Sequence, residues 1–62
     1  MNNERIVRIV EEMQVQGIRL QVVETAYEFG RHYVLLMNGE PGFANSDLDR
    51  VLNYMRSVAG VR

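Results

Sequence analysis

Apolar side chains near the start of the chain recur at a spacing of three or four residues. Ile6, Ile9 and Met13 would lie along one side of a helix at this spacing. Gly17 can adopt the left-handed backbone conformation that commonly ends a helix. The pattern therefore predicts an amphipathic helix over residues 3–16.

The next segment alternates with a period of two, which is typical of a strand. Ile18, Leu20 and Val22 are separated by single residues, and the alternation predicts a strand over residues 18–26. Gly30 follows within a short loop and supplies the backbone freedom that a hairpin turn needs.

A second strand is predicted over residues 31–37, and it is apolar on both faces. One face would carry Tyr33, Leu35 and Met37. The other face would carry Val34 and Leu36 beside His32. A strand with one face in water should alternate apolar with polar residues, so this strand is expected to be covered on both sides.

The dipeptide Asn38-Gly39 is a strong signal for a type I′ hairpin turn. Residues 40–44 could form a short return strand after this turn. Pro41 has no amide proton to donate, so such a strand would have to lie at a sheet edge. The alternative is that residues 40–44 form a loop that leads to the last helix.

The last predicted element is a helix over residues 46–59. Ser46 is the expected N-cap, Asp49 stands three residues later as in a capping box, and Gly60 ends the helix. The apolar face of this helix consists of Leu48, Val51, Leu52, Met55, Val58 and Ala59.

These elements predict an α+β fold in one domain, residues 1–62. The expected arrangement is a small two-layer domain, helix–β-hairpin–helix with a possible short third edge strand, in which both helices pack on one face of an antiparallel sheet. The competing arrangement places one helix on each face. It would bury both sides of the second strand without a partner.

The first arrangement leaves apolar side chains uncovered, and a contiguous apolar patch usually marks an interface. The chain has 62 residues, no Cys and a single His, so neither disulfides nor a structural zinc site can staple it. We therefore expect a homodimer that packs through the sheet. The expected interface residues are Tyr33, Val34, Leu36, Phe29, Phe43 and Val23.

The charge of the chain bears on a second interpretation. The net charge is -1, so the basic excess that is typical of nucleic-acid-binding proteins is missing. All seven basic residues are Arg, however, and Arg suits bidentate contacts. The alternative function is accordingly a nucleic-acid-associated regulator, which would use Arg19, Arg31, Arg5 and Arg8 from the two subunits.

No set of residues predicts catalysis, a metal site or a cofactor. His32, Glu24 and Glu28 could approach one another across the hairpin, but no nucleophile accompanies them. The sequence thus predicts a non-enzymatic protein-protein interaction module without a cofactor. Its partners would be a second copy and an unidentified protein.

The opening residues 1–5 lead into a charged amphipathic segment instead of an apolar leader. The longest apolar run, residues 33–37, is far short of the roughly 20 residues that a membrane span needs. These features predict a cytoplasmic protein without membrane contact. A bacterial or phage accessory or regulatory protein would fit this size and composition.

Overall fold

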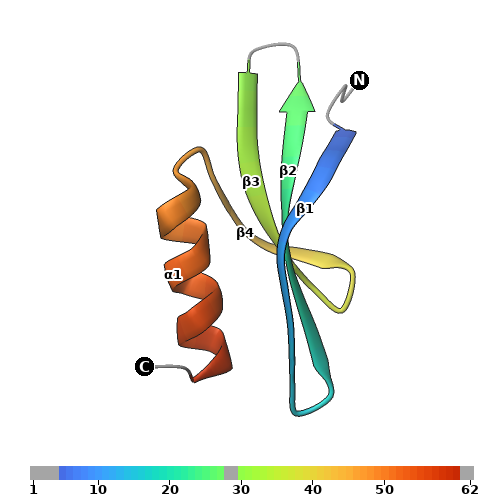
Figure 1. Cartoon of the computed structure of the whole chain (residues 1–62), viewed down its shortest axis with the longest axis vertical. Helices are drawn as coiled ribbons and strands as arrows, with labels where there is room; N and C mark the ends of the chain where they lie inside the picture. The colour runs from blue at the N-terminus through green and yellow to red at the C-terminus, as the bar shows by residue number, and fades with distance from the viewer. Residues whose placement is uncertain (1–4, 28–29, 61–62) are drawn as a thin grey trace.

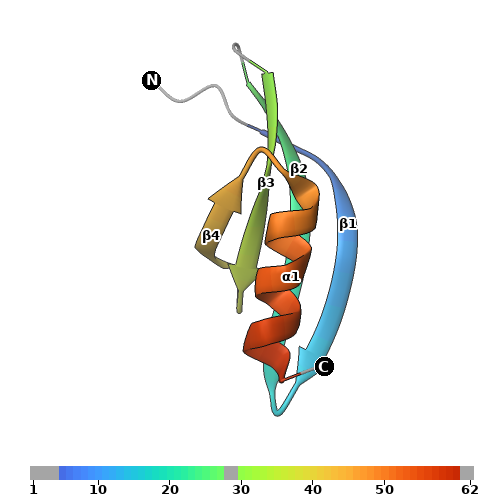
Figure 2. The ribbon, with the colours of Figure 1, turned by 90° about the vertical axis from the view of Figure 1, so that its left-hand side faces the viewer.

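The structure is a computed structural model that describes residues 5–27 and 30–60. Four strands form one antiparallel sheet in the order β1-β2-β3-β4, and a single helix, α1, follows them (Figure 1). The elements are β1 (Arg5–Val15), β2 (Ile18–Tyr27), β3 (Gly30–Met37), β4 (Glu40–Asn45) and α1 (Leu48–Ala59). Figure 2 shows α1 in front of one face of the sheet.

The predicted helix–hairpin–helix fold is wrong, because the first predicted helix is strand β1. Its pairing with β2 is interrupted at Val7 and at Val10, where β1 contains one residue more than β2. Each such bulge adds one residue to the period of two. The apolar residues Ile6 and Ile9 therefore stand three apart on the same face of a strand, a spacing that a helix would also produce.

Two-residue turns join β1 to β2 and β3 to β4 at the same end of the sheet. Gln16 and Gly17 have φ of 52° and 81°, and Asn38 and Gly39 have φ of 53° and 85°. Both pairs thus match the type I′ geometry that suits twisted hairpins. The turn at Asn38 was predicted, whereas Gly17 was wrongly expected to end a helix.

The segment after Asn38-Gly39 is a strand, which decides between the two alternatives that the sequence left open. β4 pairs with β3 along one side only and is an edge strand, as the presence of Pro41 requires. A bulge between Leu35 and Leu36 in the pairing shortens its regular part and allows Phe43 to lie opposite Leu35.

The N-cap of helix α1 lies one residue later than predicted. Asp47, not Ser46, is the N-cap, and its side chain accepts a hydrogen bond from the amide of Asp49 at 3.0 Å. Gly60 has φ of 76°, and its amide donates to the carbonyl groups of Arg56 and Ser57. The helix is thus closed at both ends by local hydrogen bonds.

The core lies between α1 and the face of the sheet that the helix covers. Its fully buried side chains come from β2, β3 and α1: Leu20, Val22, Leu35, Val51 and Met55. Each side chain of this kind contributes roughly 1.5–3 kcal/mol on burial, so five of them supply much of the driving force for folding. We name this face the helix side and the opposite face the helix-free side.

The second strand of the predicted hairpin is apolar on both faces, as expected, but only one face has a layer over it among the described residues. Val34 lies on the helix-free side, opposite Val23 on β2. Both are nonetheless buried, with 8% and 2% exposure. Since no helix in the described part of the chain covers this side, neighbouring side chains of the same sheet shield them from water.

Truncating the core should destabilise the fold strongly. Met55→Ala removes a fully buried side chain from α1 and is expected to lower the free energy of unfolding by about 2–5 kcal/mol. Val58→Ala, in the same helix but exposed, should change it by less than about 0.5 kcal/mol. Urea unfolding followed by circular dichroism measures both, and equal losses would contradict this core.

Candidate interaction surface on the edge strand

The outer half of β1 contains the sequence Arg-Ile-Val twice, in residues 5–10. The valine of each triplet is the extra residue of a bulge, so the arginine and isoleucine of the second triplet return to the faces of the first. Ile6 pairs with Thr25 and Ile9 pairs with Val23, which places both isoleucines on the helix-free side. The arginines lie on the helix side.

The apolar residues of these triplets are unusually exposed. Ile6 is 58% exposed, Val7 is 48% exposed and Ile9 is 52% exposed. They lie within four residues of one edge strand, interrupted by Arg8, whereas the other large exposed apolar residues in the described part of the chain, Ile18, Tyr54 and Val58, lie elsewhere. We name Ile6, Val7 and Ile9 the β1 patch. Exposed apolar side chains that gather in one part of a surface are typical of an interaction site.

The β1 patch continues into the centre of the helix-free side. Ile9 lies opposite Val23, and Val23 lies opposite Val34 on the next strand. Leu36, two residues farther along β3, is half-buried on the same side. A row of apolar side chains therefore crosses from the edge strand to two inner strands, exposed at Ile9 and buried at Val23 and Val34.

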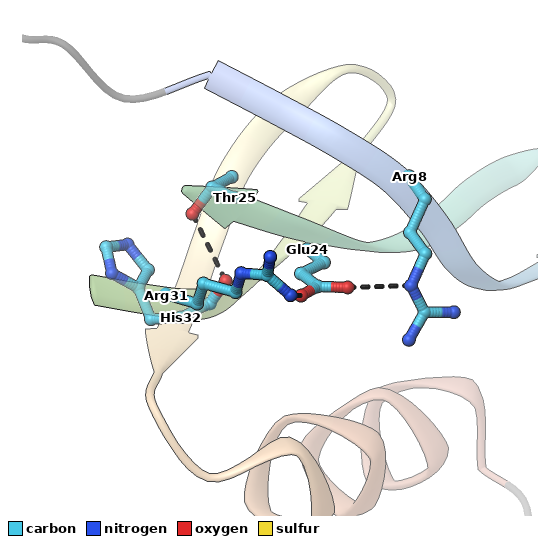
Figure 3. Close-up of polar contacts among 5 residues, drawn as sticks. All are labelled: Arg8, Glu24, Thr25, Arg31 and His32. Atoms are coloured by element: carbon cyan, nitrogen blue, oxygen red, sulfur yellow. Dashed lines mark hydrogen bonds and ion pairs between the residues drawn. The ribbon is translucent and has the colours of Figure 1, made fainter. Parts of the chain in front are cut away.

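On the helix side, a carboxylate joins three strands (Figure 3). Glu24 of β2 is buried, and its Oε1 accepts a hydrogen bond from Nε of Arg8 at 2.6 Å. Its Oε2 accepts from the guanidinium of Arg31 at 3.0 Å. Since Arg8 belongs to β1 and Arg31 to β3, the two ion pairs fix both neighbouring strands to β2. Both arginine side chains remain largely exposed.

These contacts lower the pKa of Glu24 from its usual value of 4.5. The hydrogen bond from Arg8 is the largest cause, and the positive charges of Arg8 and Arg31 act in the same direction. Burial of the carboxyl group opposes them by favouring its neutral form. Glu24 therefore carries its charge at neutral pH, and the folded state stabilises this charged form.

The predicted interface residues do not form one surface. Val23, Val34 and Leu36 share the helix-free side, as just described. Tyr33 and Phe43 instead lie half-buried on the helix side, where they pack against the core. The ring of Phe43 also stacks on Tyr54 of α1, with 4.5 Å between the ring centroids. Phe29 lies outside the described residues.

The four arginines of the nucleic-acid interpretation are also divided between the two sides. Arg5 and Arg31 both pair with Ala26, and Arg8 pairs with Glu24, so these three arginines share the helix side. Arg19 pairs with Gln14 on the helix-free side, near the two-residue turns. The sheet therefore brings together Arg5, Arg8 and Arg31 but not Arg19.

Two of the three polar residues considered for chemistry, Glu24 and His32, lie on opposite sides of the sheet. Glu24 is on the helix side, whereas His32 pairs with Thr25 on the opposite side. The hydroxyl group of Thr25 donates to the carbonyl of His32 at 3.1 Å, a contact between two strands. Glu28 lies outside the described residues, and no group of three or more metal-binding side chains occurs within residues 5–27 and 30–60.

The β1 patch was missed because its isoleucines were assigned to a helix. The signal that could have revealed it is the repeated triplet itself, with β-branched residues at two of every three positions. A helix can contain such residues, but six positions with four β-branched side chains favour a strand. The three-residue repeat then requires a bulge in each triplet.

No protein-family model, curated protein or solved structure matches this chain. In the portion that the structure describes, α1 is the one helix, and it is too short and too polar to cross a membrane.

The ion pairs of Glu24 should make folding sensitive to acid. Because the folded state lowers this pKa, the unfolded chain binds the proton more readily, and stability falls as the pH drops below about 4.5. Glu24→Gln should lower stability at pH 7 and show a weaker further loss between pH 5 and pH 2. Urea unfolding at several pH values measures this difference.

Glu40→Gln is the matched control, because Glu40 is an exposed carboxylate at the start of β4. This variant should retain the acid dependence of the wild-type chain. If Glu24→Gln retained it in full as well, the cluster would not be the source of the acid sensitivity.

Proposed function

We propose that this chain is a non-enzymatic protein-protein interaction module that works as a homodimer. The observation that carries the proposal is the β1 patch, where three large apolar side chains remain about half exposed beside a buried apolar surface. A partner that covers Ile6 and Ile9 would remove apolar area from water, which stabilises the complex in proportion to that area.

The size of the chain supports self-association. A domain of 62 residues buries roughly 60% of the surface that its unfolded chain exposes, so its own core supplies limited stability. The chain contains no Cys, and its described residues contain no candidate metal site. A second copy is the remaining common means by which small domains gain stability.

The positions and partners of the arginines favour this function over the nucleic-acid alternative. Arg8 and Arg31 already share the carboxylate of Glu24, which offsets part of their charge. Arg19 lies on the other side, and the net charge of the whole chain is -1. Affinity for phosphate groups depends on such positive charge, so the arginines give the alternative less support than the β1 patch gives the dimer.

The mass in solution tests this proposal. Light scattering at micromolar concentrations should give about twice the 7.2 kDa of the single chain. Ile9→Glu introduces a charge into the β1 patch and should weaken the dimer by at least about tenfold in Kd, because the charge would have to be desolvated.

Val58→Glu introduces the same charge at an exposed apolar position of α1 and should leave the dimer intact. Circular dichroism establishes that both variants are folded. A wild-type chain that remains at 7.2 kDa over the whole concentration range would overturn the proposed function.

A further inference from the structure

We infer that the two copies join edge to edge, with β1 of one copy pairing antiparallel with β1 of the other about a twofold axis near Ile9 and Val10. This inference rests on the proposed function and specifies the surface and its geometry. The dimer would then contain one continuous sheet of eight strands, with α1 of each copy on its own half.

The exposed apolar side chains favour dimerisation through the β1 edge of the sheet over stacking of two helix-free sides. All three members of the β1 patch lie on the edge strand, whereas Val23 and Val34 in the middle of the helix-free side are already buried within one chain. Stacking two helix-free sides would therefore gain little from those two residues. Pairing the edges covers the β1 patch directly and also satisfies outward backbone groups.

The two edges of the sheet differ in how well they can accept another strand. β4 has 6 residues and includes Pro41, which removes a donor and blocks regular pairing. β1 has 11 residues and no proline. Its bulges at Val7 and Val10 would hinder pairing with an ordinary strand. About an axis at Ile9, however, the stretch from residue 8 to residue 11 contains the Val10 bulge in both copies and so has equal length in each.

The charges along β1 make it complementary to itself. Its first half carries Arg5 and Arg8, and its second half carries Glu11 and Glu12. In an antiparallel pair centred near Ile9, the basic half of each copy lies along the acidic half of the other. Opposite charges that face one another across two strands stabilise the pairing, and like charges destabilise it, so these charges favour a register that brings Arg and Glu together.

One register joins the helix side of one copy to the helix side of the other. If Val7 and Val10 stay unpaired between the copies, as they are in the pairing with β2, Ile9 lies opposite Ile9 of the second copy. Arg8 then lies opposite Glu11 of the second copy, and both belong to the helix side. Glu24 engages Nε of Arg8, which leaves the two terminal nitrogen atoms of that guanidinium for the carboxylate of Glu11. The two Ile9 side chains then lie beside one another on the helix-free side.

Disulfide formation tests the position of the twofold axis, since the chain has no Cys of its own. Ile9→Cys should give a covalent dimer within hours under mild oxidation, because the two positions would be neighbours across the axis. Position 58 is of similar exposure, 43% against 52% for position 9, and Val58→Cys should stay largely uncrosslinked under the same conditions.

Charge reversal tests the register independently. Glu11→Arg turns two attractive contacts into repulsive ones and should raise the Kd of the dimer by at least about tenfold. Glu40→Arg makes the same change on the opposite edge and should leave the Kd within about twofold.

The outcomes separate the inference from the function on which it rests. A wild-type monomer would overturn both. A wild-type dimer in which Ile9→Cys does not crosslink and Glu11→Arg acts no differently from Glu40→Arg would overturn the edge pairing and leave the homodimer in place.

Discussion

Within residues 5–27 and 30–60, one helix of 12 residues covers one side of the four-stranded sheet, and the rest of this structure depends on how the other side is kept from water. On the helix side, α1 and the sheet enclose a hydrophobic core that includes the fully buried side chains of Leu35 and Met55. On the helix-free side, the inner residues Val23 and Val34 are shielded by their neighbours in the sheet. The isoleucines of this side that remain exposed, Ile6 and Ile9, lie on β1, so the edge strand carries the exposed apolar side chains from which the proposed dimer is argued.

The same strand connects the sheet to the ion pairs on the helix side. Because Val7 is the extra residue of a bulge, both arginines of the Arg-Ile-Val triplets project to the helix side and both isoleucines to the helix-free side. Arg8 is held by the buried carboxylate of Glu24, and this contact fixes the position of β1 against β2. The bulges that expose Ile9 thus also place Arg8 for its ion pair, and changes to one property would affect the other.

Much of the chain could be predicted from local signals. The alternation in β2, the dipeptide Asn38-Gly39 and the stop at Gly60 each depend on a few neighbouring residues, and all three are found in the structure. β1 could not be identified by periodicity alone, since two bulges give Ile6 and Ile9 a spacing that a helix shares.

The predicted interface was correct only in part about which residues share one side of the sheet. Val23, Val34 and Leu36 were correctly associated with one another, because residues of neighbouring strands can be assigned to faces by parity. Tyr33 and Phe43 were expected at the same interface, although the pairing with Leu35 and the stacking on Tyr54 place Phe43 on the helix side. The assignment of a side chain to a face at a bulged edge depends on the register of the whole sheet, which composition does not reveal.

The conformation of residues 5–15 is the most direct test of this account. Nuclear magnetic resonance of the labelled protein should show strand-type chemical shifts for this segment, with close contacts between Ile9 and Val23 and between Ile6 and Thr25. Helical shifts, with contacts from Ile6, Ile9 and Met13 to one common surface, would contradict it.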